Sequence, residues 1–259
     1  MAIVIEDAFL AARSVDDYAD FLTPHLSSES HLLDVGCGTG ALALGLAART
    51  GRVTGVDTDA DDLAEARAHA DRLGVTNAEF REGSAYGVDL PDDHVDAVFA
   101  HSLLEALERP VDALREMVRV LRPGGILAVA SVEYGGYVVS GPQSPLLRRF
   151  YEIREQLWLI EGANPYLGRR LRGLLSAAGL TEVVASTKSF SFGTTAAVRS
   201  YALDRADECS DDWYAPSAVK HGLATADDLR DMASAWTEWS ESPESFATFA
   251  WCRAVGRKP

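Results

Sequence analysis

Three glycines at alternate positions, Gly36, Gly38 and Gly40, form the stretch of this sequence best suited to hold a small ligand. Glycine adopts positive φ angles and leaves no Cβ between the backbone and a ligand. An apolar run precedes the glycines and an alanine-rich segment follows them, so the sequence predicts a strand that turns into a helix. The N–H groups and partial positive charge of a helix N-terminus favour a carboxylate or a phosphate.

Two acids and a histidine accompany this glycine loop. Asp34 lies inside the apolar run, Asp57 ends a second short run, and His101 follows a fourth. An acid about twenty residues beyond such a loop also fits the ribose-binding residue of an NAD enzyme, so the glycines alone leave an NAD-linked oxidoreductase open. His101 could act as a general base, or it could pack beside the ligand.

Strands that alternate with amphipathic helices must position these residues. The sequence predicts an α/β fold, a Rossmann-like, doubly wound and mostly parallel seven-stranded sheet with N-terminal helices and a helical insert before the last strand. The expected strands after the first cover Val53–Val56, Ala78–Arg81, Val95–Ala100, Ile126–Ser131, Glu182–Phe192 and Phe246–Gly256. Helices are expected over residues 7–26, 41–49, 63–73, 111–121, 146–160 and 167–178.

Right-handed crossovers place the carboxyl ends of the strands at one edge of the sheet, and ligands bind there. We therefore expect Gly36 to Gly40, Asp57, Gly83 to Tyr86, and Ala100 with His101 to converge on one crevice. A single domain over residues 1–259 is expected, with a cofactor-binding core at 27–131. The segments 132–166 and 193–245 are expected as substrate-side inserts, because the second is too long for a plain connection.

The composition limits the partners, the cellular location and the metal sites that can be expected. The net charge of -15 would repel a nucleic acid backbone, so no nucleic acid partner is expected. The N-terminus lacks the features of a signal peptide and no apolar stretch reaches the length of a membrane span, so a cytoplasmic protein with no membrane partner is expected. Three widely spaced cysteines and six unpaired histidines predict no metal site. The oligomeric state cannot be read from the sequence.

Several ordered motifs give a more specific identification. LLDVGCGTG, GVD at Gly55 to Asp57, the GSA loop, DAVFAHSLLEAL and REMVRVLRPGG together resemble the class I S-adenosylmethionine-dependent methyltransferases. The resemblance points to the small-molecule branch, methyltransferase type 11, which includes quinone methyltransferases. It covers roughly residues 30–131 and, more weakly, GRRLRGLLSAAGL at 168–180.

The resemblance assigns roles to matching residues, with S-adenosyl-L-methionine as cofactor. Gly36, Cys37, Gly38 and Gly40 would wrap its methionine portion and ribose, and Asp34 would hold the ammonium group or the loop. Asp57 would accept both ribose hydroxyls, and Thr58 would line the adenine. Gly83, Ser84 and Ala85 would lie at the adenine edge. The family most often has an acid where Ser84 stands, so weaker cofactor binding is a possible consequence. Ala100 and His101 complete the expected set.

The implied reaction is methyl transfer to a small-molecule acceptor by in-line displacement. An enzyme of this fold could instead use the cofactor as a scaffold for cyclisation or rearrangement. Six arginines against three glutamates between Leu146 and Arg172 leave an anionic acceptor open. The residues expected to line the acceptor come from the N-terminal helix, the region after the fifth strand and the long insert: Tyr18, Phe21, Glu133, Tyr134, Tyr137 and Trp236.

Overall fold

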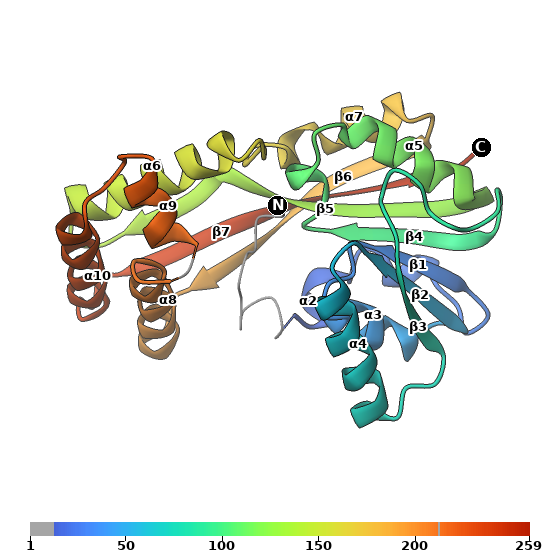
Figure 1. Ribbon diagram of the computed structural model, residues 1–259, viewed down its shortest axis with the longest axis horizontal. Coiled ribbons are helices and arrows are strands. Elements are labelled where there is room, and N and C mark those ends of the chain that lie inside the picture. The colour runs from blue at the N-terminus through green and yellow to red at the C-terminus, as the bar shows by residue number, and fades with distance from the viewer. Residues whose placement is uncertain (1–12, 212) are drawn as a thin grey trace. The chain divides into compact units, whose positions relative to one another are not determined.

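The computed structural model describes residues 13–211 and 213–259 (Figure 1). The contacts divide the chain into two compact units. The sheet unit takes its described residues from 13–132, 167–187 and 252–259, and the helical unit from 133–166 and 188–251. Strands β5 (Leu121–Ser140), β6 (Thr181–Phe192) and β7 (Phe246–Arg257) run from one unit into the other.

The remaining elements fall within one unit each. The sheet unit contains α2 (Val15–Tyr18), η1 (Thr23–His25), β1 (His31–Val35), α3 (Ala41–Ala47), β2 (Arg52–Asp57), α4 (Ala60–Leu73), β3 (Ala78–Glu82), β4 (Val95–His101), η2 (Leu104–Ala106), α5 (Pro110–Val120), η3 (Gly168–Arg170) and α7 (Leu171–Ala177). The helical unit contains α6 (Pro145–Ile160), α8 (Thr195–Glu208), α9 (Tyr214–Lys220) and α10 (Ala226–Ser240).

The seven strands form one sheet in the order β3-β2-β1-β4-β5-β7-β6. Pairings among β1 to β5 are parallel, which explains why β1 and β4 read as nearly continuous apolar runs: both faces of such strands are covered. Leu32, Leu33, Val98 and Phe99 are completely buried. The predicted doubly wound, mostly parallel sheet is confirmed.

Strand β7 runs against its neighbours. The Gly124 N–H donates to the Lys258 carbonyl at 2.9 Å, and the Lys258 N–H donates to the Gly125 carbonyl at 3.0 Å. These bonds join the start of β5 to the residue that follows β7, so the two strands are antiparallel.

The helix or helix pair expected over residues 7–26 consists, in the described part, of two short pieces, α2 and η1. Ser14 caps α2 by accepting from the Asp17 N–H, and the helix ends after one turn because Ala19 leaves the helical conformation, with φ -130°. Pro24, which has no N–H group, then lies in the first turn of η1. Residues 7–12, including Phe9 and Leu10, lie outside the described residues.

The fifth strand is much longer than the expected Ile126–Ser131. It continues to Ser140, so residues 132–140 are part of the strand. The two glycines in this region argue against a strand by propensity, but lateral pairing within the sheet outweighs propensity.

Three helices account for the segment 193–245, and they pack with α6 around an aromatic core. The core includes Phe150, Tyr201, Tyr214, Trp236 and Trp239, each at most 3 % exposed. Phe150 and Tyr214 lie with ring centroids 4.7 Å apart. Burial of such large rings supplies most of the apolar area that stabilises a helical unit. Among the described helices, none has the length and apolar character that crossing a bilayer requires.

Candidate functional site

The register of the sheet aligns the carboxyl ends of β1 to β4, and β5 continues beyond them. Val35 pairs with Val56, Asp57 with Glu82, and His101 with Ala130. The glycine loop after β1, the acid that ends β2, the GSA loop after β3 and the histidine that ends β4 therefore lie along one edge of the sheet unit. This is the edge at which doubly wound sheets bind ligands.

All three loop glycines adopt positive φ angles, 75° at Gly36, 49° at Gly38 and 79° at Gly40. Two of them also lack room for a side chain: a Cβ at Gly36 would lie 2.9 Å from Leu103, and one at Gly40 would lie 2.9 Å from Phe80. A Cβ at Gly38 would meet only the Asp62 carboxylate, at 3.7 Å. Packing around the loop therefore requires glycine at positions 36 and 40. Gly38, in contrast, has an open side that a ligand could approach.

Asp57 organises the loop through its carboxylate. Its Oδ2 accepts from the Gly38 N–H at 2.8 Å, and its Oδ1 accepts from the N–H groups of Thr58 at 2.7 Å and Asp59 at 3.1 Å. A carboxylate has about four acceptor positions, so these three bonds leave little capacity for a ribose hydroxyl. Accepting both ribose hydroxyls, as the resemblance implies, therefore requires sharing or exchanging one of these bonds. Thr58 itself is exposed.

Asp34 has a different environment, because its side chain is 3 % exposed and its carboxylate makes no hydrogen bond within residues 13–211 and 213–259. Burial, with repulsion from Asp57, raises the pKa of Asp34 to about 7. A buried carboxyl group without a partner is costly, and a cationic group brought beside it would relieve that cost. The site therefore offers a place for an ammonium group.

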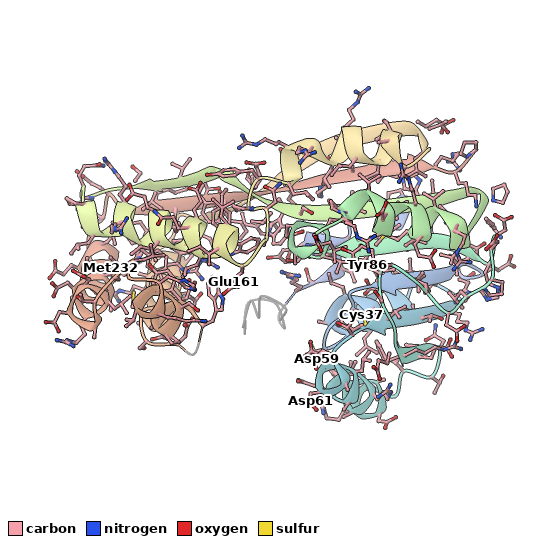
Figure 2. All side chains as sticks on the ribbon, turned by 45° about the horizontal axis from the view of Figure 1, so that its top comes forward. Cys37, Asp59, Asp61, Tyr86, Glu161 and Met232 are labelled. Carbon is pink, nitrogen blue, oxygen red and sulfur yellow. The ribbon has the colours of Figure 1, made fainter. Side chains whose placement is uncertain are left out.

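Cys37 is packed below the loop rather than presented for chemistry. Its sulfur packs against Gly55, and a Cβ at Gly55 would lie only 2.9 Å from that sulfur. Burial and the nearby Asp34 and Asp57 carboxylates raise the pKa of the thiol far above its usual range. A protonated thiol is a poor nucleophile, so the structure favours a packing role. Figure 2 labels Cys37 within the sheet unit, together with Asp59, Asp61 and Tyr86.

The loop after β3 is a tight turn. The Gly83 N–H donates to the Asp57 carbonyl at 2.8 Å, which ties this loop to the end of β2. Ser84 accepts from the Tyr86 N–H through its Oγ at 3.2 Å, and Ala85 is buried. The Ser84 hydroxyl thus serves the turn in this structure, as an acid at the same position could.

His101 is 6 % exposed, and Ala100 before it is 1 % exposed. The Arg13 guanidinium lies 2.8 Å from His101 Nδ1. An arginine can only donate, so Nδ1 accepts and the proton of the neutral ring is assigned to Nε2. Burial, and secondarily Arg13, hold the pKa of His101 well below its usual range. In this arrangement His101 has no lone pair available to remove a proton, which argues against the general-base hypothesis.

Aromatic side chains surround His101. The ring of Tyr18, 7 % exposed, meets the imidazole edge-on with centroids 5.4 Å apart. Phe21 packs against Phe99 at 6.2 Å, and the Arg253 guanidinium lies over its ring at 5.0 Å. Of the residues expected to line an acceptor, Tyr18 and Phe21 therefore lie in the sheet unit beside the end of β4.

Glu105 is a site residue that the sequence reasoning missed. It lies in η2 just after β4, is 1 % exposed, and accepts from the Ser131 hydroxyl at 2.8 Å and the Val132 N–H at 3.3 Å. Burial raises the pKa of its carboxyl group, although these hydrogen bonds oppose the shift. Glu105 thus links the segment just after β4 to the middle of β5. An acid flanked by apolar residues in SLLEAL was the available signal.

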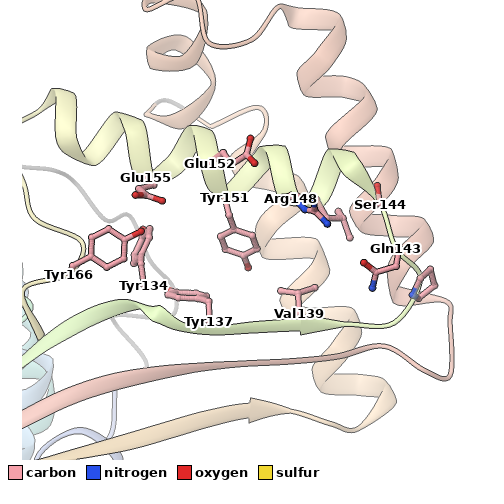
Figure 3. A pocket seen from close by; sticks show the side chains of 12 residues that line it. Tyr134, Tyr137, Val139, Gln143, Ser144, Arg148, Tyr151, Glu152, Glu155 and Tyr166 are labelled. Carbon is pink, nitrogen blue, oxygen red and sulfur yellow. The ribbon is translucent and has the colours of Figure 1, made fainter. Parts of the chain in front are cut away.

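The helical unit holds a second feature, a cavity of about 350 Å³ between β5 and α6 (Figure 3). Tyr134 and Tyr137 line it, as do side chains from α6. Glu133, 7 % exposed, accepts from the Gly135 N–H at 2.9 Å and is not part of the lining. Trp236 requires a correction: its side chain is completely buried among the helices, where it packs against Phe150 and Tyr151, rather than in the lining.

The residues at the strand edge fit S-adenosylmethionine. The unpaired, buried Asp34 carboxyl suits its ammonium group, the open side of Gly38 suits close approach of its methionine portion, and Asp57 is the acid within reach of hydroxyl groups. Within the described residues no cluster of three or more histidine, cysteine, aspartate or glutamate side chains could hold a metal ion.

The doubly wound sheet with its glycine loop and following acid defines an α/β protein that binds a nucleoside-containing cofactor at its strand ends. Comparisons with known proteins identify the family. Residues 33–129 match the methyltransferase domain. The chain is 29 % identical to "probable methyltransferase ltbC" of Aspergillus luteorubrus, over 95 % of this chain and 92 % of that one. It is 33 % identical to the ubiquinone biosynthesis O-methyltransferase of Aeromonas salmonicida, over 39 % of this chain and 42 % of that one.

The solved structure of the 4+2 cyclase SpnF is also similar, with a TM-score of 0.59 and 27 % identity over 96 % of this chain and 85 % of that one. The chain is a class I S-adenosylmethionine-dependent methyltransferase. Its cofactor is S-adenosyl-L-methionine, so the NAD-linked alternative is set aside.

Proposed function

We propose that this enzyme transfers the methyl group of S-adenosylmethionine to a small-molecule acceptor by in-line displacement. The observation that carries the proposal is the strand edge, where the Asp57 carboxylate holds the Gly38 N–H at 2.8 Å beside the buried Asp34 carboxyl. The similarity to an O-methyltransferase of ubiquinone biosynthesis and the modest volume of the cavity support a small acceptor.

Bound S-adenosylmethionine supplies an electrophilic methyl group on a sulfonium. The acceptor's electron pair forms the new bond to carbon, the carbon–sulfur bond breaks with its pair left on sulfur, and any acceptor proton is released. The enzyme's contribution is alignment and exclusion of water. In this proposal Gly36, Cys37, Gly38 and Gly40 bind the methionine portion with Asp34, and Asp57 binds the ribose.

Thr58, Gly83, Ser84 and Ala85 are proposed to border the adenine. His101, with its Nδ1 engaged by Arg13, is proposed to orient groups at the end of β4 rather than to remove a proton. A base, where the acceptor needs one, would then come from another residue.

A second candidate is cyclisation or rearrangement on the same scaffold, with the cofactor bound but unreacted. The similarity to the 4+2 cyclase SpnF over nearly the whole chain is the observation that favours it. Both candidates require cofactor binding, and they differ in whether S-adenosylhomocysteine is formed.

The test combines binding and turnover. Calorimetry should show S-adenosylmethionine binding that Asp57→Asn weakens at least about tenfold, because a charged acceptor of hydroxyl and N–H groups is lost. Asp71→Asn, an exposed change on α4, is the matched control and should bind as the wild type does. With an acceptor library and methyl-labelled cofactor, label should enter the acceptor as S-adenosylhomocysteine accumulates. An acceptor converted without S-adenosylhomocysteine would overturn methyl transfer in favour of cyclisation or rearrangement.

A further inference from the structure

The cavity of the helical unit has walls of aromatic rings. Tyr134 and Tyr137 from β5 lie with centroids 5.0 Å apart, and Tyr137 and Tyr151 from α6 lie 5.5 Å apart. Tyr166 also lines the cavity (Figure 3). Tyrosine rings stack on or meet the edges of planar aromatic ligands, so these walls suit a flat molecule better than a branched aliphatic one.

A local irregularity in β5 brings the first two tyrosines together. Side chains three positions apart face opposite sides of a regular strand, yet Tyr134 and Tyr137 line the same cavity. Gly135 and Gly136 lie between them, and the Gly135 N–H donates to the carboxylate of Glu133, two residues earlier. The alternation of side chains along β5 is therefore irregular at the glycine pair, which places both rings on one side.

Besides the exposed Arg148 guanidinium, two polar groups of the lining are available to a ligand. The Tyr134 hydroxyl is buried without a hydrogen bond to any described residue. The half-buried Glu155 carboxylate likewise has no hydrogen bond or ion pair within residues 13–211 and 213–259. The Tyr151 hydroxyl, in contrast, is already paired with that of Tyr201. Figure 3 shows Glu155 pointing from α6 toward the rings of Tyr134 and Tyr166.

Charged side chains lie both in the lining and behind the aromatic wall, and the lining itself carries Arg148, Glu152 and Glu155. Arg154 and Arg205 share the single carboxylate of Glu208, at 3.2 and 2.6 Å, and all three side chains are at most 14 % exposed. Two guanidinium groups against one carboxylate leave a net positive charge. Its field acts at the tyrosines: burial raises the pKa of Tyr137 to about 12, and Arg154 opposes that shift. The guanidinium groups behind the wall favour an oxygen with partial negative charge, and the Glu155 carboxylate in the lining favours a hydrogen-bond donor; a hydroxyl group satisfies both.

We propose that this cavity binds the acceptor, and that the acceptor is a planar aromatic compound with a ring hydroxyl group. Its ring lies against Tyr137 and Tyr151, and its hydroxyl accepts from the Tyr134 O–H and donates to Glu155. Tyr134 then has the partner that a buried hydroxyl requires. The proposal rests on the proposed function in one respect, because it calls the ligand of this cavity the acceptor.

The first test compares two probes that differ only in the hydroxyl, 2-naphthol and naphthalene, by calorimetry on the full-length protein with S-adenosylhomocysteine present. The wild type should bind 2-naphthol about tenfold more tightly, as expected for a hydrogen bond to a buried donor. Tyr134→Phe keeps the ring and removes only the hydroxyl. It should reduce the preference to less than about threefold and leave naphthalene binding unchanged.

Glu155→Gln tests the other contact. It should weaken 2-naphthol several-fold, because a neutral amide oxygen accepts less strongly than a carboxylate. Gln156→Ala is the matched control, since Gln156 is the next residue on α6, is exposed, and is not part of the lining. It should bind both probes as the wild type does. Far-ultraviolet circular dichroism of each variant checks that it is folded.

Trimethylphenylammonium serves as the competing cationic probe. Tighter binding of this probe than of 2-naphthol, or an unchanged preference in Tyr134→Phe, would overturn the proposal. The two proposals fail separately. If 2-naphthol binds as described but no acceptor is ever methylated, the cavity assignment holds and methyl transfer does not. If another acceptor is methylated while neither naphthyl probe binds, methyl transfer holds and the cavity assignment does not.

Discussion

Asp34 and Asp57 are both strand-end aspartates of the sheet unit, yet their carboxyl groups have opposite surroundings. Asp57 is half-buried and accepts three backbone N–H groups, whereas Asp34 is 3 % exposed and accepts none among the described residues. One carboxylate therefore shapes the loop, and the other keeps its hydrogen-bonding capacity. The difference is set by position, since Asp34 lies within the central strand β1 and Asp57 at the last residue of β2.

Asp34 should make stability fall as pH rises. Its pKa in the folded protein, about 7, lies above the model-compound value of 3.8, so the folded state binds the proton more strongly. The stabilising contribution is complete below about pH 4 and is lost as pH rises through 7. Between pH 5 and 8 the wild type should lose about 2 to 3 kcal/mol of unfolding free energy relative to Asp34→Asn, measured by urea denaturation.

The control for this comparison is Asp71→Asn, whose unfolding free energy should stay parallel to that of the wild type across the same pH range. If the wild type and Asp34→Asn ran parallel as well, Asp34 would ionise as an ordinary surface carboxylate does, and its proposed place beside an ammonium group would lose its electrostatic reason.

At the scale of elements, the glycine loop and the helix that follows it depend on close packing. Gly40 caps α3 with φ 79°, and a Cβ there would meet both Phe80 of β3 and Ala66 of α4, at 2.9 and 3.0 Å. Phe80 of β3 and Ala66 of α4 therefore leave no room for a side chain at this position of the loop. A glycine is required at this position for its backbone angle and also for its lack of volume.

Gly40→Ala should cost more stability than Gly74→Ala. Both glycines are left-handed, but a Cβ at Gly74 would meet nothing within 4 Å, so Gly74→Ala measures the backbone term alone, about 1 kcal/mol. Gly40→Ala should cost about 2 to 3 kcal/mol, since overpacking is added. It should also weaken S-adenosylhomocysteine binding, which Gly74→Ala should not. Equal costs in chemical denaturation would contradict the packing argument.

The elements that the sequence predicted well are those with strong local signals. Leu32, Leu33 and Val35 form a buried run, and Gly36 breaks it, so β1 and its loop were predictable. The N-terminal helix was overpredicted, because the apolar spacing through Phe21 and Leu22 reflects packing of a turn and η1 instead. The prediction ended β5 at Ser131, because the later glycines have low strand propensity. Pairing with neighbouring strands in the sheet outweighs that propensity.

The candidate site residues also divide into those that a local sequence signal predicted and those that it did not. The loop glycines, Asp34 and Asp57 follow from consecutive sequence, and Tyr134 and Tyr137 from proximity to a strand end. Tyr151 and Glu155 could not be found, because only the packing of α6 over β5 brings them to the same cavity. Trp236 was misplaced because a large aromatic residue in an insert serves a core or a ligand equally well by composition.

On the scale of the whole molecule, all five tryptophans belong to the helical unit, while the glycine loop and Asp57 belong to the sheet unit. Tryptophan fluorescence therefore reports unfolding of one unit, and cofactor binding acts on the other. Three strands, β5, β6 and β7, run through both units. Continuous strands favour cooperative unfolding, because one unit cannot unfold without releasing the strands of the other.

S-adenosylhomocysteine at 100 times its Kd should raise the midpoint of thermal unfolding followed by tryptophan fluorescence. The stabilisation is about 2.7 kcal/mol, which corresponds to roughly 5 to 10 °C for a protein of this size. Circular dichroism should give the same midpoint. A fluorescence midpoint that stays fixed while the dichroism midpoint rises would show that the two units unfold independently.

The glycine pair in β5 affects how this enzyme could change its ligand over evolution. Substitutions at Tyr134, Tyr137 or Val139 would alter the cavity one contact at a time. Loss of a single codon at Gly135 or Gly136 would leave Tyr134 and Tyr137 two positions apart and so on one face of a regular strand, whereas loss of Val138 would turn every later side chain of the strand to its other face. One small deletion at Val138 would thus change the β5 wall of the cavity at Val139 while the strand ends proposed to hold the cofactor kept their sequence, which offers an abrupt route to a new acceptor.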